Sequence, residues 1–378
     1  MSEYNLFCVI KEKKTTYFWK VTTVNCRHQS AFMKRYNILV LTDHTTHSQQ
    51  NSVYEMCAAL RQHPAVGRIH MASRGNEANH GFFYHYSTTE LEVWSLRHNI
   101  NLAHAQTALV HNTIRVDARF FDAVWLRLPR PIPEGFFSFL TTHIDEHRIL
   151  NRPSGVREVG NKSFLVNFPG LIPPSRWVRT VEEIWTFHER FPIVLKPLEN
   201  YGGRGVVKLR RGYIYEGRNQ IPLRDYLPVI EEQLSRGGYL AMKFMKNVHQ
   251  GDKRIVVVNG EIVGAALRMP PKGSWICNAA QGGMAVFSMP DEHERRMVHQ
   301  LNHSLIPRGI AMYGIDTLVG DDGRRVLSEI NALSIGGVKS MAALSNLPLV
   351  ERSADLLMDY ITTHVNNRKG MKVLALRG

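Results

Sequence analysis

Residues 314–331 read GIDTLVGDDGRRVLSEIN, and they hold the most informative pattern of the chain. Two strand-like runs flank an Asp-Gly pair, which favours a two-residue hairpin turn of type I′. With Asp322 and Gly323 at the turn, Asp316 pairs directly with Glu329, and Asn331 lies on the same face. The stretch therefore predicts an antiparallel hairpin on which two carboxylates face each other.

Such a pair of facing carboxylates suggests a metal site. Like charges directly opposite each other destabilise a sheet unless a cation lies between them. Two carboxylates and an amide oxygen are the hard ligands that Mg²⁺ prefers, with water and phosphate oxygens completing its shell. We therefore predict that Asp316, Glu329 and Asn331 bind Mg²⁺, with Mn²⁺ as a substitute. The alternative is a solvated hairpin whose carboxylates contact nearby arginines, which follows if the register slips by one residue.

A second motif, upstream of the hairpin, suits an anionic ligand. Residues 191–197 (FPIVLKP) place Lys196 at the end of an apolar strand, on the same face as Val194. A lysine that points inward in this way needs an anion. The following Gly202-Gly203-Arg204-Gly205 turn lets the backbone approach phosphate oxygens closely, although it matches neither Walker A nor GxGxxG. Alone, these features also fit an edge-strand lysine and a plain turn, but beside a metal hairpin they indicate a nucleotide site.

The flanking sequence predicts an N-terminal unit over residues 33–150. Strands at 38–41, 120–128 and 149–151 alternate with helices at 53–62 and 135–144. This alternation favours an open parallel sheet. Residues 1–32 show no clear period and are interpreted as an extension, with Met33 as the functional start. We expect the extension to be dispensable for folding and activity; the alternative is that it forms an added strand.

Two further units are predicted, over residues 151–245 and 246–366, followed by a tail at 367–378. The first contains helices at 161–168 and 180–190 and the strand that carries Lys196. The second contains strands at 254–258 and 261–268, joined by a type I′ turn at Asn259-Gly260. A helix at about 291–305 and a C-terminal helix around 350–365 complete it.

Composition narrows the class of protein. The chain has 378 residues, 44% of them hydrophobic and 21% charged, which is ordinary for a globular protein. Its apolar runs are far shorter than the ~18 residues of a membrane span. Four cysteines without a CxxC pair, and no convincing signal peptide, predict a cytoplasmic protein. The net charge of +14 favours anionic partners, but no aromatic–basic motif supports nucleic-acid binding.

In this combination the motifs resemble the ATP-grasp superfamily, specifically its bacterial glutathione synthetase type. The elements that carry the resemblance are VLKPLENYGGRGV at 194–206, GDKRIVVVNGEIV at 251–263, NAAQGG at 278–283 and GID…SEIN at 314–331. Two more segments, WLRLPRPIPEGF at 125–136 and NRPSGVREVGNK at 151–162, resemble family segments of the N-terminal domain and of the start of the central domain. The resemblance covers roughly residues 37–365 of the chain.

The resemblance implies an α/β fold in which an N-terminal open parallel-sheet domain precedes two α+β subdomains that clamp ATP. It implies an ATP-dependent carboxylate–amine ligase that works through an acyl phosphate, for example joining γ-glutamylcysteine to glycine. Alternatives are an amino-acid ligase acting on a protein or peptide, as in the ribosomal-protein glutamate ligase type, and a non-catalytic synapsin-like ATP-binding protein. The expected partners are a small carboxylate and a small amine, and the family is often oligomeric.

The resemblance also implies roles for individual residues. The implied nucleotide contacts are Lys162, Lys196, Gly202, Gly203, Gly205, Met242, Lys243, Phe244 and Asp252. The implied catalytic residues are Arg254 on the transferring phosphoryl group and Arg268 and Asn278 at the acyl-phosphate site. The implied Mg²⁺ ligands are again Asp316, Glu329 and Asn331.

Two segments are candidates for substrate binding. Arg127 and Arg130 flank prolines at the end of a predicted strand of an open α/β sheet, whose carboxyl ends face the ligand crevice, so they are expected to bind a substrate carboxylate unless they are plain surface charge. The family's Ser-Pro-Thr after the EIN element is replaced here by Ser334-Ile335-Gly336, followed by Gly337. We predict that residues 334–338 choose the amine; the alternative is that the glycines only turn the chain. The family's Arg-Gly before NAAQGG is also absent, since Ile276-Cys277 stands there.

Overall fold

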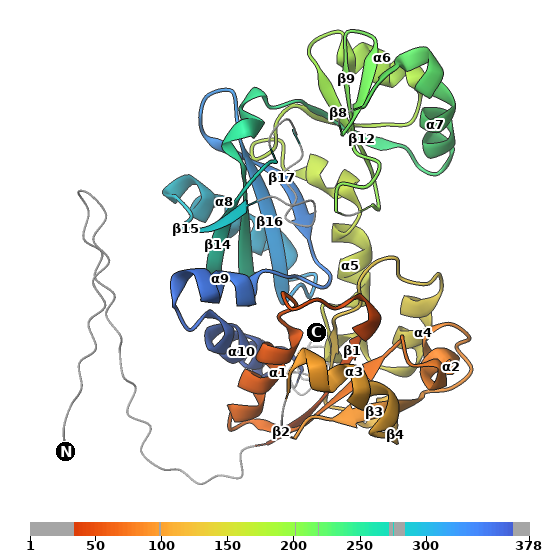
Figure 1. Cartoon of the computed structure of the whole chain (residues 1–378), viewed down its shortest axis with the longest axis vertical. Coiled ribbons are helices and arrows are strands. Elements are labelled where there is room, and N and C mark those ends of the chain that lie inside the picture. Colours follow the sequence, from red (N-terminus) through yellow and green to blue (C-terminus); the bar gives the residue numbers. More distant parts are fainter. Residues whose placement is uncertain are drawn as a thin grey trace, which may run out of the picture. The chain divides into compact units, whose positions relative to one another are not determined.

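The computed structural model describes residues 34–97, 100–200, 202–217, 219–271, 275 and 284–365. The predicted extension at 1–32, the predicted tail at 367–378 and Asn278 lie outside these described ranges. The described residues from Arg35 onward belong to one compact unit. Three sheets organise this unit, in the chain order drawn in Figure 1.

The first sheet has the strand order β4-β3-β2-β1-β5-β6. Its strands are β1 (Tyr36–Thr42), β2 (Val66–Ser73), β3 (Glu90–Ser95), β4 (Thr113–Asp117), β5 (Ala123–Leu126) and β6 (Ile149–Leu150). β1 is parallel to β2 and β5, and β5 is parallel to β6, which confirms the predicted parallel sheet for β1, β5 and β6 and adds β2, which was not among the predicted strands. β3 is antiparallel to both β2 and β4. The alternation of strands and helices did not predict this antiparallel edge of the sheet.

Helices cover both faces of the first sheet because β1 is apolar on both sides. Ile38 and Val40 pack into one core with α1 (Val53–Gln62) and α3 (Leu102–His111). Leu39 and Leu41 pack into another with α2 (His80–Phe83) and α4 (Phe136–His143). The predicted helix at 53–62 is confirmed. The predicted strand at 120–128 is shorter in the structure, because residues 118–120 form a 3-10 turn that the Asp117 side chain caps.

The second sheet is antiparallel, with the strand order β11-β10-β9-β8-β12-β7. Its strands are β7 (Ser175–Val178), β8 (Ile193–Pro197), β9 (Val207–Arg210), β10 (Tyr213–Glu216), β11 (Asn219–Pro222) and β12 (Tyr239–Lys243). The helices α6 (Val181–His188) and α7 (Leu223–Ser235) share its core. The helix predicted at 161–168 is wrong in type: α5 spans Pro153–Val159, and a 3-10 helix over Lys162–Asn167 follows, capped by Asn161.

The third sheet is also antiparallel, with the order β15-β14-β13-β16-β17. Its strands are β13 (Asp252–Val258), β14 (Glu261–Met269), β15 (Met284–Ser288), β16 (Met312–Val319) and β17 (Arg325–Asn331). Asn259 and Gly260 have φ of 48° and 79°, which confirms the type I′ turn between β13 and β14. On one face lies α8 (Glu292–Leu305), which begins with the capping box formed by Asp291 and Glu294.

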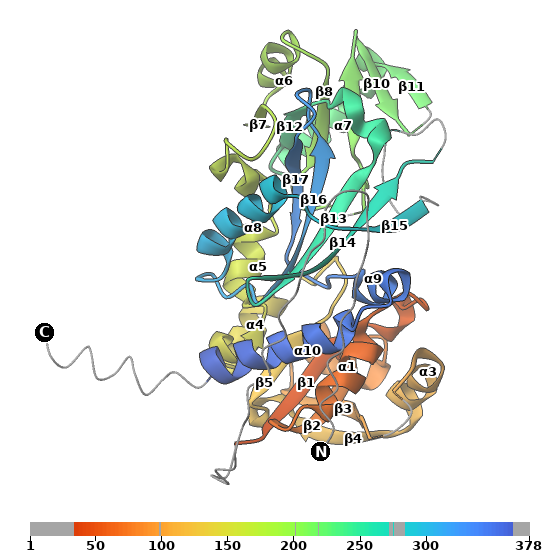
Figure 2. The same ribbon diagram turned by 90° about the vertical axis from the view of Figure 1, so that its left-hand side faces the viewer.

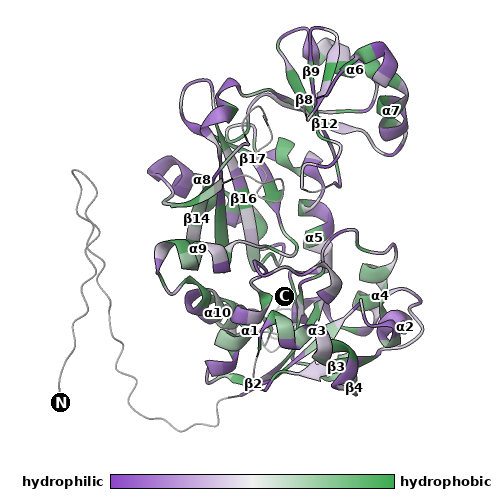
Figure 3. Cartoon of the chain, in the orientation of Figure 1, coloured by the Kyte–Doolittle hydropathy of each residue, from purple (hydrophilic) through white to green (hydrophobic). Residues whose placement is uncertain are grey.

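Two C-terminal helices connect the third sheet to the first. α9 (Val338–Ser345) and α10 (Leu349–Tyr360) share a core with β13 and with α1 (Figure 2). A π-helical turn over Ile361–Val365 continues α10, so the helix predicted around 350–365 is confirmed. Hydrophilic residues dominate the visible side of α8, whereas β14 is largely hydrophobic (Figure 3). No helix in the described ranges is long and apolar enough to cross a membrane.

The β16–β17 hairpin differs from its prediction in an instructive way. The turn is a three-residue loop, closed by the Gly320 N–H donating to the Arg324 carbonyl at 2.7 Å, with Gly323 in the left-handed region. This shifts the register near the turn by one residue. A bulge that leaves Ser328 unpaired shifts it back, so Asp316 still pairs with Glu329 and Gly314 with Asn331. The predicted turn type is therefore wrong, and the predicted carboxylate pairing is confirmed.

Candidate functional site

A pocket is lined jointly by the second sheet, the third sheet and the segments that connect to them. β8, β12 and the glycine turn contribute one wall, and β13, β14, β16 and β17 contribute the other. The predicted site residues that line it are Lys162, Lys196, Gly202, Gly203, Met242, Lys243, Phe244, Asp252, Arg254, Arg268, Asp316, Glu329 and Asn331. Gly205, Arg127, Arg130, Ser334, Gly336 and Gly337 are not among its lining residues.

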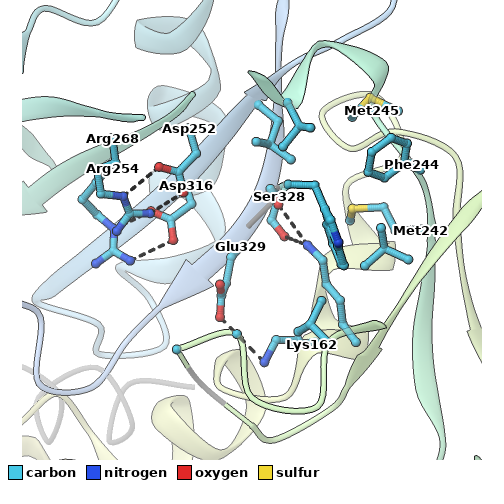
Figure 4. Close-up of a pocket in the computed structure, with 18 of the residues that line it drawn as sticks. Lys162, Met242, Phe244, Met245, Asp252, Arg254, Arg268, Asp316, Ser328 and Glu329 are labelled. Carbon is cyan, nitrogen blue, oxygen red and sulfur yellow. Dashed lines mark hydrogen bonds and ion pairs between the residues drawn. The ribbon is translucent and has the colours of Figure 1, made fainter. Parts of the chain in front are cut away.

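The charge of this pocket is positive. The cationic side chains that line it are Lys162, Lys196, Lys243, Arg254 and Arg268, and the anionic ones are Asp252, Asp316 and Glu329. Figure 4 shows the arginines and Asp252 and Asp316 together, away from Met242, Phe244 and Met245. An excess of cations in a partly enclosed site favours an anionic ligand such as a polyphosphate.

Lys196 is fixed at the centre of the pocket by the hairpin bulge. Its Nζ donates to the Ser328 carbonyl at 3.0 Å and to the Ser328 hydroxyl at 2.9 Å. The bulge leaves this carbonyl out of the ladder, so it is free to accept the ammonium. Burial lowers the pKa of Lys196 to about 8, against the opposing effect of Glu329. A lysine held this way by neutral groups still has capacity to neutralise an anion.

Lys162 enters the same pocket from the 3-10 helix that follows α5. Its Nζ lies 3.7 Å from the Glu329 carboxylate and donates to the Asn200 carbonyl. Its backbone N–H donates to the Leu198 carbonyl at 2.9 Å, which joins the 3-10 helix to the end of β8. Burial lowers the pKa of Lys162, with Glu329 acting against it. Two lysines that are 34 positions apart in the sequence thus line one pocket, as predicted.

Arginines and carboxylates form a cluster at the other end of the site. Arg254 makes a two-point contact with Asp316, with Nη2 to Oδ2 at 2.8 Å. Arg268 bridges the two acids, with Nε 2.7 Å from Asp252 and Nη2 2.9 Å from Asp316. Burial opposes ionisation of Asp316, but the two guanidinium groups outweigh it and hold its pKa well below the usual range. Burial and the charge of Asp316 raise the pKa of Asp252 to about 6.

The oxygen atoms of Asp316, Glu329 and Asn331 are the kind of ligand that a hard divalent cation prefers. Asp316 and Glu329 are opposite each other, and the Asn331 amide lies 3.4 Å from Asp316. The Glu329 side chain is 23% exposed and is the more accessible carboxylate, whereas Asp316 is occupied by its two arginines. The alternative prediction was a solvated hairpin whose carboxylates contact arginines. Asp316 does contact two arginines, but it is buried and not solvated.

The opposite end of the pocket is apolar. Val194, Met242 and Phe244 line it, together with Leu318 and the Trp275 ring. The Phe244 and Trp275 rings meet edge to face with centroids 6.0 Å apart. This apolar end, called the apolar slot below, lies next to a cationic region and has the character expected for a nucleobase site beside its phosphates.

An aromatic cage around Lys208 supports this apolar end. The Lys208 ammonium lies 4.8 Å from the centroid of Phe244, 4.6 Å from Tyr215 and 5.5 Å from Trp275. Cation–π attraction of this kind contributes roughly 0.5–2 kcal/mol per contact, depending on exposure. Lys208 therefore holds Phe244 and Trp275 in place along the slot.

The glycine turn adopts a backbone that other residues rarely reach. Gly202, Gly203 and Gly205 have φ of 67°, 75° and 69°. A Cβ on Gly205 would also lie 3.1 Å from the Pro197 ring. Gly202 and Gly203 line the pocket, so side chains are absent where the turn approaches the ligand space.

The predicted substrate residues gather around the first sheet rather than in this pocket. The strand order reverses at β1, with β2 on one side and β5 on the other, and such a switch point is where α/β sheets bind ligands. Arg127 follows β5 at this point, and its carbonyl accepts from the Ser334 hydroxyl at 3.3 Å. Gly336 and Gly337 follow Ser334, and Gly337 is the N-cap of α9. Arg130 instead lines a second pocket.

Arg127 is buried and has no carboxylate within salt-bridge distance in the described part of the chain. The residue is 3% exposed, and its Nε has no hydrogen-bond partner among the described atoms. Burial lowers its pKa to about 10. A buried guanidinium without a counter-charge is costly, which favours a site for an anionic substrate group.

Sequence reasoning missed Ser328 and Trp275, which line the pocket, and Asn151, which lies outside it. Ser328 fixes Lys196, and only its place beside Glu329 could have drawn attention to it. Trp275 lies in the glycine-rich stretch after β14 and carries no spacing signal. Asn151, at the end of the first sheet, pairs its amide with the Met312 N–H and carbonyl and with the Ala332 carbonyl at 2.6–2.9 Å, and so fixes the segment after Asn331.

Comparisons with known proteins point to one family. Residues 161–346 match the family described as prokaryotic glutathione synthetase, ATP-grasp domain. The chain is 32% identical over 249 residues to a glutathione synthetase of Parasynechococcus marenigrum, covering 64% of this chain and 76% of the relative. It is 31% identical over 249 residues to one of Rhodopseudomonas palustris, covering 64% and 75%.

Solved structures show the same fold at low sequence identity. The crystal structure of the D-cycloserine synthetase DcsG superposes with a TM-score of 0.62 at 14% identity, covering 86% of this chain and 99% of that one. The D-alanyl-alanine synthetase A of Vibrio cholerae gives 0.53 at 14% identity, covering 89% and 100%. The predicted α/β fold class is confirmed by these neighbours and by the sheets described above. The chain belongs to the prokaryotic glutathione synthetase family of ATP-grasp proteins and is an ADP-forming ligase that joins a carboxylate to an amine.

Proposed function

We propose that the chain ligates a peptide-like acid to the amino group of a small amino acid, as in the synthesis of glutathione from γ-glutamylcysteine and glycine. The observation that carries this proposal is the single pocket that contains Lys162, Lys196 and the facing pair Asp316 and Glu329. Phosphoryl transfer from ATP needs these parts: cations for the phosphates and oxygen ligands for a divalent ion.

ATP would lie with its base in the apolar slot and its phosphates toward the lysines. Met242 and Phe244 line the slot, and Lys162 and Lys196 line the cationic side. Gly202 and Gly203 would cover the γ-phosphate and exclude water from the reacting groups. Glu329, Asn331 and Asp316 would hold Mg²⁺, which would supply charge neutralisation at the phosphates.

The residues of this chain would act by alignment and charge. A carboxylate oxygen of the acid attacks the γ-phosphorus, ADP leaves, and an acyl phosphate forms. The amine then attacks the acyl carbon, inorganic phosphate leaves with the former carboxylate oxygen, and the nitrogen loses a proton. Arg254 and Arg268, both of the arginine–carboxylate cluster, would stabilise the charge that develops during both transfers.

The amine would be selected by the segment from Ser334 to Val338. Ser334 contacts the Arg127 carbonyl, and Gly337 opens α9, so a carboxylate carried by the amine would meet the Arg127 guanidinium and backbone N–H groups. No described atom lies within 4 Å of the position that a Gly336 Cβ would occupy. This open space favours a second candidate, in which the amine is larger than glycine or belongs to a peptide.

The proposal extends to the substrates, the cell compartment and the oligomeric state. The substrates would be small molecules or short peptides, and neither the polar pocket nor its neighbours suggest nucleic acid. A cytoplasmic site of action is proposed from the sequence, whose four cysteines form no CxxC pair. We expect a homo-oligomer, because the family is often oligomeric.

A phosphate-release screen tests the proposal. ATP and Mg²⁺ are supplied with a panel of carboxylates crossed with a panel of amines that includes glycine and longer amino acids. We expect release that requires both an acid and an amine, highest for a peptide-like acid. A Gly336→Thr variant should raise KM for the amine several-fold and leave KM for ATP unchanged. The substrate proposal fails if no peptide-like acid supports release, or if Gly336→Thr alters only the ATP constant.

A further inference from the structure

A second pocket lies beside the proposed ATP site and shares no lining residue with it. It has a volume of about 590 Å³, in the range of small-molecule sites. The loop between β5 and α4 forms one side, and the end of α5 with Glu199 forms the other. The Arg157 guanidinium joins the two sides, donating to the Ser138 hydroxyl at 2.8 Å and lying over the Phe137 ring.

This second pocket shares a wall with the ATP site. At two places, consecutive residues line different pockets. Asn161 lines the second pocket and Lys162 lines the first, while Glu199 lines the second pocket and Asn200 lines the first. The wall is held together by the Lys162 N–H bond to the Leu198 carbonyl and by the Lys162 ammonium bond to the Asn200 carbonyl. The Lys162 ammonium therefore lies next to both pockets.

Electrostatics agrees with this adjacency. Arg130 and Glu199, which both line the second pocket, lie close enough to interact electrostatically with Lys162. The second pocket thus adjoins Lys162, whose ammonium lies 3.7 Å from Glu329 and beside which the proposed function puts the γ-phosphate.

The second pocket differs from the first in its charge balance. Arg130 and Arg157 supply two positive charges, and Glu134 and Glu199 supply two negative ones. A neutral pocket with both signs suits a ligand that itself carries both signs, whereas the positive first pocket suits a polyphosphate. An amino-acid end with a free ammonium and a free carboxylate is such a ligand.

We propose that this second pocket binds the α-amino-acid end of the acid substrate, with its carboxylate toward Arg130 and Arg157 and its ammonium toward Glu134 and Glu199. The inference rests on the proposed function, because it assigns the end of the acid that is remote from the activated carboxylate. In γ-glutamylcysteine this is the glutamyl end, while the cysteinyl carboxylate extends past Lys162 to the γ-phosphate. The acid is thereby selected for a zwitterionic end.

Direct binding tests the assignment independently of turnover. Calorimetry measures γ-glutamylcysteine and its deamino analogue glutarylcysteine, each added to the full chain with a non-hydrolysable ATP analogue and Mg²⁺. We expect γ-glutamylcysteine to bind about tenfold or more tightly than the analogue, as a charge-assisted hydrogen bond implies. In a Glu134→Gln/Glu199→Gln variant this preference should fall toward one, a change that a merely structural role would not produce. Equal affinities in the unmodified protein, or no detectable binding of γ-glutamylcysteine, would overturn the assignment.

Kinetics with matched variants gives the second arm. Arg157→Gln should raise KM for γ-glutamylcysteine about tenfold and leave KM for ATP unchanged, with partial recovery in Arg157→Lys. The control is Arg115→Gln on β4, whose side chain is 67% exposed and lines neither pocket. Unchanged KM for the acid in Arg157→Gln overturns the inference while leaving ligation intact. Selective binding without release of ADP would instead retain the pocket and reject the proposed function.

Discussion

At the residue scale, Lys196 shows how position alone gives a side chain its role. It was predicted from the strand that places it on the face of Val194, and both residues line the pocket. Its partner Ser328 was not predictable, because the bulge that exposes the Ser328 carbonyl has no sequence signal. A lysine held by neutral oxygens binds an added anion without first breaking an ion pair.

Replacing Lys196 should weaken nucleotide binding. A charge-assisted contact contributes about 1.5–3 kcal/mol, so Lys196→Ala should raise the Kd for ATP by about tenfold to a hundredfold. Titration with a fluorescent ATP analogue measures this. Arg224→Ala on α7, where the side chain is 85% exposed, is the control for loss of one positive charge. An unchanged Kd in Lys196→Ala would exclude the assigned role.

His47 makes the stability of the fold dependent on pH. Its ring nitrogens contact the Tyr54 hydroxyl at 2.7 Å and the Thr42 hydroxyl at 3.0 Å. Burial first, and then the nearby Arg127, lower its pKa to about 4, with Asp43 opposing and His44 adding to the effect. In the unfolded chain the pKa is about 6.5. The folded state therefore favours the neutral ring, and stability is lost as pH falls from about 6.5 toward 4.

The check compares melting temperatures at pH 7 and pH 5. The unmodified protein should lose more on acidification than His47→Gln, which cannot take up a proton at this position. A residual loss is expected in the variant, because burial also lowers the pKa of His44, His70 and His188. Identical losses in the two proteins would show that His47 titrates normally in the fold.

At the element scale, the β16–β17 hairpin shows what a sequence pattern can and cannot provide. The facing carboxylates were predictable because alternation along two strands restricts which residues share a face. The loop length was not, because Asp-Gly is compatible with two-residue and three-residue hairpin loops. A bulge then restored the pairing, so a wrong turn and an unforeseen bulge cancelled at Asp316 and Glu329.

The three-residue loop predicts a cost for replacing its glycine. Gly323 has φ of 83°, and no described atom lies within 4 Å of its added Cβ, so Gly323→Ala should lose about 1–2 kcal/mol through backbone strain alone. Urea unfolding measures the loss. The matched control is Gly336→Ala, which has equal space and no left-handed φ, and should unfold like the unmodified protein. Equal stability of the Gly323 variant would contradict the loop geometry.

A buried ion pair joins α8 to the third sheet on the face away from the pocket. The Lys253 ammonium lies 2.6 Å from Glu294, which is fully buried and also accepts from the Thr317 hydroxyl at 2.8 Å. Asp252 and Arg254, the neighbours of Lys253 on β13, point into the pocket instead. The pair thus anchors the strand whose alternate side chains form the site.

Breaking this pair should be costly. Lys253→Met leaves the buried Glu294 carboxylate to the more distant Arg325 guanidinium at 3.8 Å and should lower the free energy of unfolding by up to about 3–5 kcal/mol, as should Glu294→Gln for the converse reason. The double variant should lose less than the sum of the two. The exposed pair Arg296 and Glu292 on α8 is the control and should contribute at most about 0.5 kcal/mol. Additive losses for Lys253 and Glu294 would show that the two do not interact.

At the scale of the whole molecule, periodicity predicted elements better than their assembly. α1 and α8 were predictable because apolar residues recur at helical spacing, and Asp291 marks the start of α8. The antiparallel edge of the first sheet was not, because β3 and β4 read like any other short strands. The Arg127–Ser334 contact and the Asn151 bridge join residues more than 160 positions apart, and no local pattern reports such contacts.

The proposed ligation begins with one chemical step, in which the γ-phosphate of ATP activates the acid in the pocket of Lys162, Lys196 and the facing carboxylates. Isotope transfer tests it most directly. γ-Glutamylcysteine carrying ¹⁸O in its cysteinyl carboxylate is turned over with ATP, Mg²⁺ and glycine, and the released phosphate is examined by mass spectrometry. We predict one ¹⁸O atom in each inorganic phosphate, with ADP as the other product. Unlabelled phosphate, or label in AMP with release of pyrophosphate, would contradict the account.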